Sequence, residues 1–291
     1  GMNFITFQFN NLGVIYMKTI EQLDEQMISP SSRLIADIKK VTGDIMILGV
    51  GGKMGPTLAK LAKRAIEEAG LNKKVIGVSR FSSGTLKSEL EEFGVETISA
   101  DLLNEAELKA LPQVDNIIFM AGKKFGTVGD EHTTWGMNTY LPGRVAEKFS
   151  NSNIVVFSSG NIYPFVNVNH GGCTEETRTD PVGEYAQSTL GRERIFTYFA
   201  KKNRTPVLLF RLNYAIDMKY GVLLEIAQQV YNNEPIDLTT GLVNVIWQGD
   251  ANEYALRSLL HCNVDPMILN VTGPETISVR WLATEFARYF D

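Results

Sequence analysis

Residues Asp44 to Ala69 read DIMILGVGGKMGPTLAKLAKRAIEEA, and this stretch decides the fold. Its first part, Ile45 to Val50, is a short apolar run of the kind that forms a buried strand. Four glycines follow within seven residues, at positions 49, 51, 52 and 55. From Met54 onward, apolar side chains recur at helical spacing with lysine, arginine and glutamate between them. The stretch therefore predicts a strand, a tight glycine turn and an amphipathic helix.

A strand, a glycine-rich turn and a helix in this order are typical of a dinucleotide-binding unit. Glycines let the backbone approach a pyrophosphate, and the helix N-terminus presents unpaired N–H groups and a positive dipole to it. The spacing Gly49-x-x-Gly52-x-x-Gly55 fits such a loop, whereas a GxGxxG pattern would place its third glycine at Met54. The alternative is an ordinary tight turn, and the flanking strand and helix favour the binding loop. The expected cofactor contacts in the loop are Gly49, Gly51, Gly52, Lys53, Met54 and Gly55.

Composition limits the classes of protein to consider. A chain of 291 residues, 44% apolar and 21% charged, has ample material for a core in one large domain or two smaller ones. The net charge of −5 argues against nucleic acid as a partner. Two cysteines and three scattered histidines predict neither a disulfide framework nor a metal site, and favour a cytoplasmic location. No apolar run approaches the roughly 20 residues of a membrane span.

Apolar runs alternate with amphipathic segments along most of the chain, which predicts an α/β fold with a doubly wound parallel sheet of the Rossmann type. The expected strands are 45–50, 74–79, 95–100, 114–121, 153–158 and 206–212. The expected helices between them include 86–93, 104–111, 134–149 and 182–201. Beyond residue 213 we expect helices 222–231, 249–260 and 279–289 and strands 236–238, 242–247 and 267–271.

The order of the expected strands and helices divides the chain into three parts. Residues 1–43 are an N-terminal extension with lead-in helices, broken at Pro30. Residues 44–213 form the NAD(P)-binding Rossmann domain. Residues 214–291 form a smaller substrate-facing portion packed on it, and because the chain stops directly after a helix, this portion is a candidate for truncation at its C-terminus.

The end of the second strand bears on which cofactor is bound. An acidic residue there would bind both adenosine ribose hydroxyls and repel a 2′-phosphate. This sequence has Ser79 and Arg80 instead, and a guanidinium pairs well with phosphate, so NADP is slightly favoured over NAD. The alternative for Arg80 is a solvated strand end. Asp101, after the third strand, is either an acceptor for the adenine amino group or the cap of the next helix.

A second group of motifs lies beyond the fourth strand. Ser158-Ser159-Gly160-Asn161-Ile162-Tyr163 follows the fifth strand, and Tyr185-Ala-Gln-Ser-Thr189 begins the long helix. With these motifs, the chain from about 44 to 289 resembles an extended short-chain dehydrogenase/reductase of the NAD-dependent epimerase/dehydratase family. Further segments agree with the resemblance, namely Asp101-Leu102, Ala121-Gly122, Asn138, Arg211-Leu212-Asn213, 244–251 and 270–275.

The resemblance implies redox chemistry on a hydroxyl of a sugar or nucleotide sugar. A tyrosine exchanges the hydroxyl proton while a nicotinamide takes or returns hydride, and a serine or threonine holds the same oxygen. By position, Tyr185 is the acid/base and Ser159 the hydroxyl. The resemblance also implies cofactor contacts at Asp101, Leu102, Ala121, Gly122, Asn138 and Asn213. It implies a homodimer through the helices at 134–149 and 182–201.

One position departs from the family pattern. The family carries YxxxK, with a lysine one helical turn after the tyrosine, and this chain has Thr189 there. A lysine would lower the pKa of the phenol by charge proximity, which a threonine does not do. One interpretation is that another cation substitutes: Arg192, Lys123 or Lys124. A second is that the chemistry needs less of a base. The third is that the chain is a non-catalytic NAD(P)-binding sensor or partner-binding protein.

Overall fold

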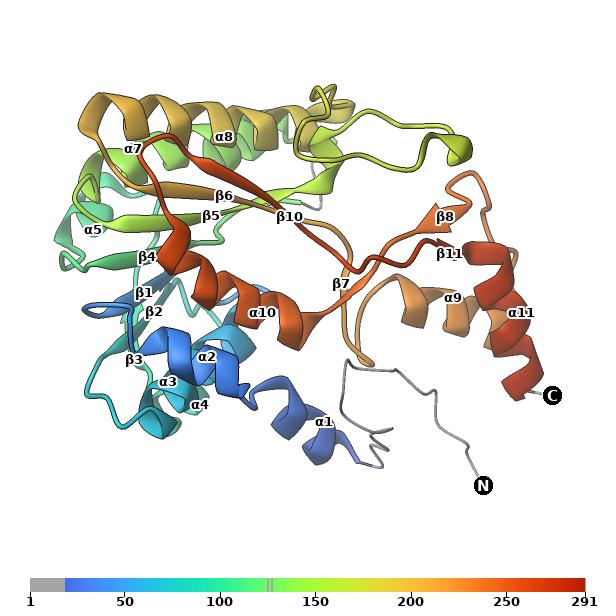
Figure 1. Cartoon of the computed structure of the whole chain (residues 1–291), viewed down its shortest axis with the longest axis horizontal. Coiled ribbons are helices and arrows are strands. Elements are labelled where there is room, and N and C mark those ends of the chain that lie inside the picture. Colours follow the sequence, from blue (N-terminus) through green and yellow to red (C-terminus); the bar gives the residue numbers. More distant parts are fainter. Residues whose placement is uncertain (1–18, 125, 127, 291) are drawn as a thin grey trace.

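A single parallel sheet of seven strands forms the centre of the protein. The computed structural model describes residues 19–124, 126 and 128–290. The strand order is β10-β6-β5-β4-β1-β2-β3 (Figure 1). The strands are β1 Ile45–Leu48, β2 Val75–Ser79, β3 Glu96–Ser99, β4 Asn116–Phe119, β5 Asn153–Ser159, β6 Val207–Leu212 and β10 Met267–Val271. The predicted Rossmann-type parallel sheet is confirmed.

Helices cover both faces of the sheet, which explains the continuous apolar character of its central strands. In β1, Ile45 and Ile47 pack toward one layer, whereas Met46 and Leu48 pack toward the other, because alternate side chains point to opposite faces. The layer under the sheet in Figure 1 contains α2 Ser32–Ile38, α3 Gly55–Glu68, α4 Leu86–Glu92 and α10 Gln248–Arg257. The opposite layer contains α5 Glu105–Ala110, α7 Leu141–Lys148 and α8 Gly183–Asn203.

Strand order reverses between β1 and β4, and this reversal positions the site. From β1 the chain proceeds outward through β2 and β3, then returns to β4 on the other side of β1 and continues to β5 and β6. Ligands of doubly wound sheets bind at the carboxyl ends of the strands beside such a reversal. The glycine turn follows β1 and the segment Ala121-Gly122 follows β4, so both lie at this point.

The expected helix at 134–149 is interrupted in an unforeseen way. It consists of α6 Glu131–Trp135, a π-helical turn η1 Gly136–Tyr140, and α7. A π-turn widens the helix locally and is often found at functional sites. Here it carries Asn138, which is completely buried.

The last 78 residues divide between two places. Strand β10 lies parallel to β6 in the main sheet, and α10 packs on α3, so both belong spatially to the large layer structure. In contrast, α9 Val222–Tyr231 and α11 Val279–Phe290 pack together with short strands in a separate apolar cluster (Figure 1). These short strands are β8 Leu242–Val243, which pairs with β11 Ile277–Ser278, and β9 Ile246–Trp247, which pairs with β7 Ala215–Ile216. The boundary expected at residue 213 stays a prediction.

Two strand predictions for this portion are wrong. Residues 236–238 form no strand. The strand expected over 242–247 is two strands, β8 and β9, which pair in different small sheets. The break lies at Asn244, whose amide nitrogen donates to the carbonyl of Glu275 at 2.8 Å, so the chain leaves one sheet before it enters the next.

The lead-in helices form as expected on either side of Pro30. Helix α1 Ile20–Met27 is capped by Thr19, and α2 is capped by Ser31, whose hydroxyl accepts from the N–H of Leu34 at 3.1 Å. Among the helices of the described residues, none combines the length and apolar character that crossing a bilayer requires.

Candidate functional site

Two of the loop glycines are required by close packing around the turn. A side chain at Gly49, where φ is +90°, would place its Cβ 2.6 Å from the backbone nitrogen of Ala121. At Gly55 the Cβ would lie 2.2 Å from the carbonyl oxygen of Val50. The first glycine therefore lets the turn after β1 lie against the end of β4, and the third lets α3 pack against the turn itself.

The middle of the loop is open instead. A Cβ at Gly52 would meet only the carbonyl oxygen of Gly49, at an ordinary distance of 3.7 Å. The N-cap residue of α3, Met54, makes no side-chain capping bond, so the first N–H groups of this 14-residue helix have no cap from that side chain. A close-packed turn, an open middle glycine and an uncapped helix N-terminus together fit the pyrophosphate of a dinucleotide.

A polar cluster that sequence reasoning missed fixes the start of α3. The hydroxyl of Thr57 donates to the carbonyl of Met54 at 3.1 Å. It accepts from the side-chain amides of Gln248 at 3.0 Å and Asn252 at 2.9 Å, both on α10. Thr57 and its partners on α10 are nearly 200 residues apart in the sequence, so no local sequence pattern predicts that they meet. The contact explains why a C-terminal helix helps to hold the glycine loop.

The residues expected at the adenosine end follow or end the adjacent strands β2 and β3. Ser79 is half-buried, and its Oγ lies 2.5 Å from where a Cβ at Gly51 would be, so the hydroxyl lies against the glycine loop. Arg80 is exposed. At the neighbouring strand, Asp101 Oδ1 accepts from the N–H of Leu103 at 3.0 Å, in a local turn. The cap of α5 is Asn104, so the alternative of Asp101 as that helix cap is wrong.

Three other expected cofactor contacts differ in exposure. Leu102 is buried in the core between the sheet and the α5 layer. Lys53 is exposed, and its Nζ lies 4.8 Å above the ring centroid of Tyr220. Asn213 is half-buried and joins segments that converge on the site: its side-chain amide donates to the carbonyl of Asn244 at 3.3 Å. A Cβ at Gly160 would lie 3.0 Å from Asn213 Oδ1.

The buried Asn138 ties the loop after β4 to α8. Its Oδ1 accepts from the N–H of Lys123 at 2.8 Å, and its amide donates to the Lys123 carbonyl at 2.9 Å and to Ser188 Oγ at 3.0 Å. Both amide hydrogens are therefore used within the protein. Gly122 packs above this contact, since a Cβ there would lie 3.1 Å from Asn138 Oδ1. Asn138 holds the loop in place beneath the site.

The two serines at the end of β5 have different roles. Ser158 is buried, and its hydroxyl donates to Glu193 Oε1 at 2.6 Å. Ser159 is half-buried, and its Oγ accepts the N–H of Asn161 at 3.2 Å, at the start of the 3₁₀ turn η2 Gly160–Ile162. Within the part of the chain that the structure describes, the Ser159 hydroxyl accepts this bond and donates none, whereas that of Ser158 donates to Glu193.

Tyr185 lies half-buried on the first turn of α8, which packs against β5 and η2. Thr189, at the position where the resemblance places a lysine, has only 1% of its surface exposed. Its hydroxyl donates to the carbonyl oxygen of Tyr185 at 2.8 Å, a bond within the helix. The packing of α8 on β5 and η2 thus brings the elements of Ser159 and Tyr185 together, and Thr189 adds no charge to them.

Of the candidate replacement cations, Arg192 lies in the interior. Its Nη1 donates to the carbonyl of Phe157 at 2.7 Å and its Nη2 to Asn138 Oδ1 at 3.0 Å. Burial lowers the pKa of the Arg192 guanidinium to about 10, while the negative forms of Tyr185 and Glu193 oppose this shift. Lys123 instead forms an ion pair with Asp130.

A buried network that was not expected joins α8 to β6. Arg211 Nε and Nη2 donate to the two carboxylate oxygens of Glu193 at 2.9 and 2.8 Å, a bidentate pair with both side chains almost fully buried. Arg211 Nη1 also donates to the hydroxyl of Tyr163 at 2.7 Å, and this hydroxyl donates to Asn270 Oδ1 at the same distance. The network fixes the loop after β5 relative to β10. The sequence indicates this network only by placing charged residues, Glu193 and Arg211, within elements that are otherwise apolar enough to be buried.

The described residues include no cluster of three or more histidine, cysteine or acidic side chains that could hold a metal ion.

Comparisons with known proteins agree with this architecture. The family model described as "NAD dependent epimerase/dehydratase family" matches residues 45–218, more than half of the chain. No curated protein matches the sequence.

Solved structures share the fold. An epimerase from Methanothermobacter thermautotrophicus superposes with a TM-score of 0.71 at 14% identity, over 90% of this chain and 81% of that one. The UDP-glucose 4-epimerase of Thermus thermophilus, solved with NAD, gives 0.67 at 18% identity over 84% and 82%. The UDP-glucuronic acid 4-epimerase of Bacillus cereus, also solved with NAD, gives 0.66 at 15% over 84% and 83%. With the family match, the glycine loop and the parallel sheet, this chain belongs to the NAD-dependent epimerase/dehydratase family.

Proposed function

We propose that the protein binds a nicotinamide dinucleotide across residues 49–55 and exchanges hydride and a proton at a hydroxyl of a sugar or nucleotide sugar. The observation that carries the proposal is the difference between two loop glycines in the space that a side chain would have. Gly55 has no room for a side chain, whereas Gly52 faces open space at the N-terminus of α3. Several fold relatives bear names of UDP-sugar epimerases, which supports the substrate class.

At the other end of the site, Tyr185 and Ser159 transfer the proton of the substrate and bind its oxygen. A bound nicotinamide supplies a centre that accepts and returns hydride. Tyr185 takes the proton of the substrate hydroxyl while a hydride leaves the carbon that bears this hydroxyl. In the reverse step Tyr185 returns the proton to the substrate oxygen. Ser159 donates its hydroxyl proton to the substrate oxygen and keeps it in place. Asn138 and Gly122 hold the loop after β4, so that the site keeps its shape.

The cofactor is NAD or NADP, with NADP slightly favoured by Ser79 and Arg80. Arg80 is exposed at the end of β2, where a 2′-phosphate would be accessible to its guanidinium. Ser79 is small and uncharged, so it does not repel a phosphate as an acidic residue at this position would.

The experiment that tests the proposal is calorimetric titration of protein stripped of nucleotide, with NAD, NADP and their reduced forms. Binding of either pair is the expected result, and the cofactor-loaded protein is then mixed with UDP-glucose and UDP-galactose while absorbance at the reduced-nicotinamide band is followed. No binding of any of the four nucleotides would refute the assignment of the glycine loop.

A second function, a non-catalytic NAD(P)-binding sensor or partner-binding protein, is favoured by one observation. Thr189 is buried and bonded to its own helix, so the charge that the family pattern supplies at this position is missing. Thr189→Lys separates the two functions, with Thr189→Ser as the control that keeps the hydroxyl. A gain of turnover in Thr189→Lys indicates a silenced enzyme, whereas loss of an existing activity indicates an enzyme adapted to threonine.

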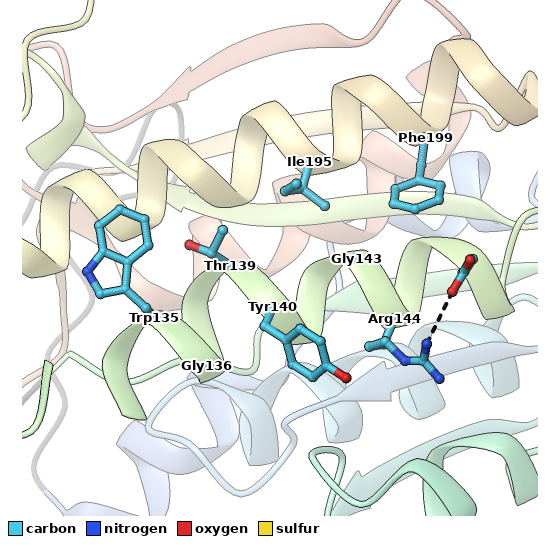
Figure 2. A pocket seen from close by; sticks show the side chains of 9 residues that line it. Trp135, Gly136, Thr139, Tyr140, Gly143, Arg144, Ile195 and Phe199 are labelled. Carbon is cyan, nitrogen blue, oxygen red and sulfur yellow. Dashed lines mark hydrogen bonds and ion pairs between the residues drawn. The ribbon is translucent and has the colours of Figure 1, made fainter. Parts of the chain in front are cut away.

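We further propose a homodimer through the outer face of η1, α7 and α8. A groove of about 460 Å³ lies between these helices and the end of α6, lined by Trp135, Gly136, Thr139, Tyr140, Gly143, Arg144, Glu147, Ile195 and Phe199. Figure 2 shows Ile195 and Phe199 of α8 facing the helix below them. Gly143 supports close approach of the two helices, because a Cβ there would already contact Ile195 at 3.4 Å. An apolar groove on an outer face is typical of an interaction site.

A further inference from the structure

The segment 217–221, between β7 and α9, contacts the glycine loop through one aromatic side chain. Tyr220 of this segment is half-buried, and the Nζ of Lys53 lies over its ring, 4.8 Å from the ring centroid. An ammonium over the face of an aromatic ring is attracted by the negative charge of that face. The contact therefore joins the C-terminal part of the chain to the loop proposed to bind the pyrophosphate.

The segment that carries Tyr220 is held by its own hydrogen bonds and by α1. The N–H of Asp217 donates to the carbonyl of Tyr220 at 3.0 Å, and the N–H of Lys219 donates to the carboxylate of Asp217. The ammonium of Lys219 pairs with Asp24 of α1, and Figure 1 shows the chain between β7 and α9 reaching toward that helix. These bonds fix the ring of Tyr220 beside the loop.

Lys53 has a positive charge that no carboxylate neutralises within the part of the chain that the structure describes. The acidic groups of the segment and of α1 that lie nearest in these contacts, Asp217 and Asp24, are engaged with Lys219. An ammonium has three N–H donors, and a ring face occupies only one side of it. The other side is therefore available to an anion.

The place of Lys53 in the loop indicates which anion this is. It directly follows Gly52, where a side chain would meet open space, and directly precedes Met54, the N-cap residue of α3 that makes no side-chain capping bond. The positive end of the helix dipole and the free N–H groups of the first turn act at the same point. A phosphate oxygen in this space would be attracted by both the helix and the ammonium.

We propose that Tyr220 is a positioning residue of the cofactor site. Its ring holds the ammonium of Lys53 at the open side of the glycine loop, where this ammonium binds a phosphate oxygen of the dinucleotide. An unrestrained lysine loses rotamer freedom when it binds an anion, and the ring removes part of this loss before the nucleotide arrives. The inference rests on the proposed function for the identity of the anion.

Titration calorimetry with the better-binding nucleotide tests whether the two side chains act together. Tyr220→Leu should weaken binding about threefold, whereas Tyr220→Phe, which keeps the ring, should stay within about 1.5-fold of wild type. In a Lys53→Met background, Tyr220→Leu should cause no further loss, because the ring then has no ammonium to hold. No loss in Tyr220→Leu, or an equal loss with and without Lys53, would overturn the inference.

Tyr198→Leu is the matched control for these titrations. It removes a contact of the same kind on α8, where the Nζ of Lys202 lies 5.7 Å from the centroid of the Tyr198 ring. Nucleotide affinity should be unchanged in this variant, because α8 meets the glycine loop through neither residue. An equal loss in Tyr198→Leu and Tyr220→Leu would show a general effect of removing a surface ring, and would also overturn the inference.

A measurement without nucleotide separates this inference from the proposed function. The lysines are methylated with ¹³C, and the Lys53 signal is assigned with Lys53→Arg. The ring current of Tyr220 shifts this signal upfield, so it should move downfield in Tyr220→Leu and stay in place in Tyr198→Leu. If Tyr220→Leu does not fold, the wild type should still show a nuclear Overhauser cross-peak between the Lys53 methyl groups and the Tyr220 ring. An unmoved signal or an absent cross-peak overturns the inference, whereas failure of all four nucleotides to bind refutes the proposed function.

Discussion

The hydroxyl of Ser158 donates to Glu193 at 2.6 Å, and the same carboxylate holds Arg211 through two further bonds. Three elements, β5, α8 and β6, therefore meet at one buried carboxylate. The residue after Ser158 is the proposed substrate-holding Ser159, so this contact determines where the end of β5 lies relative to the helix that carries Tyr185.

Glu193→Gln should destabilise the protein strongly. It leaves the guanidinium of Arg211 buried without its charge partner, which costs about 3–5 kcal/mol in comparable pairs. The control is Glu67→Gln, which breaks an exposed pair with Lys63 and should cost less than about 1 kcal/mol. Urea unfolding of both variants at pH 7 measures the difference. Equal losses would show that the buried pair contributes no more than a surface pair.

Two glycine substitutions should separate folding from binding. Gly55→Ala should lower the free energy of unfolding by about 2 kcal/mol or more, because its Cβ would lie 2.2 Å from a backbone oxygen. Gly52→Val should keep the melting temperature near that of wild type, since the site is open. It should nevertheless weaken nucleotide binding at least tenfold, because the side chain would occupy the space of the pyrophosphate. Calorimetry with the better-binding nucleotide tests this, and unchanged affinity in Gly52→Val would contradict the proposed loop.

Arg80→Ala should affect NADP and NAD unequally. Loss of a hydrogen-bonded guanidinium should weaken NADP binding about tenfold and leave NAD within about twofold. Arg280→Ala on α11 is the control, since it removes an exposed arginine from another part of the surface. Titration of each variant with both nucleotides gives the ratio. A parallel loss for both nucleotides would place Arg80 outside the 2′-phosphate site.

Phe199→Glu should dissociate the proposed dimer. A carboxylate in the apolar groove of Figure 2 would lose solvation on association. Sedimentation velocity should show a species of half the wild-type mass. Tyr231→Glu, at an aromatic residue of α9 that is 70% exposed, is the control and should leave the mass unchanged. A monomeric wild type, or a dimer retained in Phe199→Glu, would contradict the interface.

Local patterns were sufficient to predict most of the elements. The strand, glycine turn and helix of residues 44–69 contain their own signals, in apolar runs, glycines and helical spacing, and the structure has β1 and α3 there. Helix 222–231 has the predicted bounds. The strand expected over 242–247 divides between two sheets, because pairing partners far along the chain decide strand ends.

The sequence by itself determined the fold class and the glycine turn, and it shows a threonine four residues after Tyr185. The glycine turn and the Tyr185 segment each depend on residues within a few positions of one another, and the fold class follows from a succession of such local patterns. Only the tertiary structure decided that Thr57 meets α10, that Glu193 pairs with Arg211, and that Arg192 lies buried against Phe157 and Asn138. The reason is physical: burial and charge pairing depend on which elements pack together, and this information is spread over the whole chain rather than held in any local pattern.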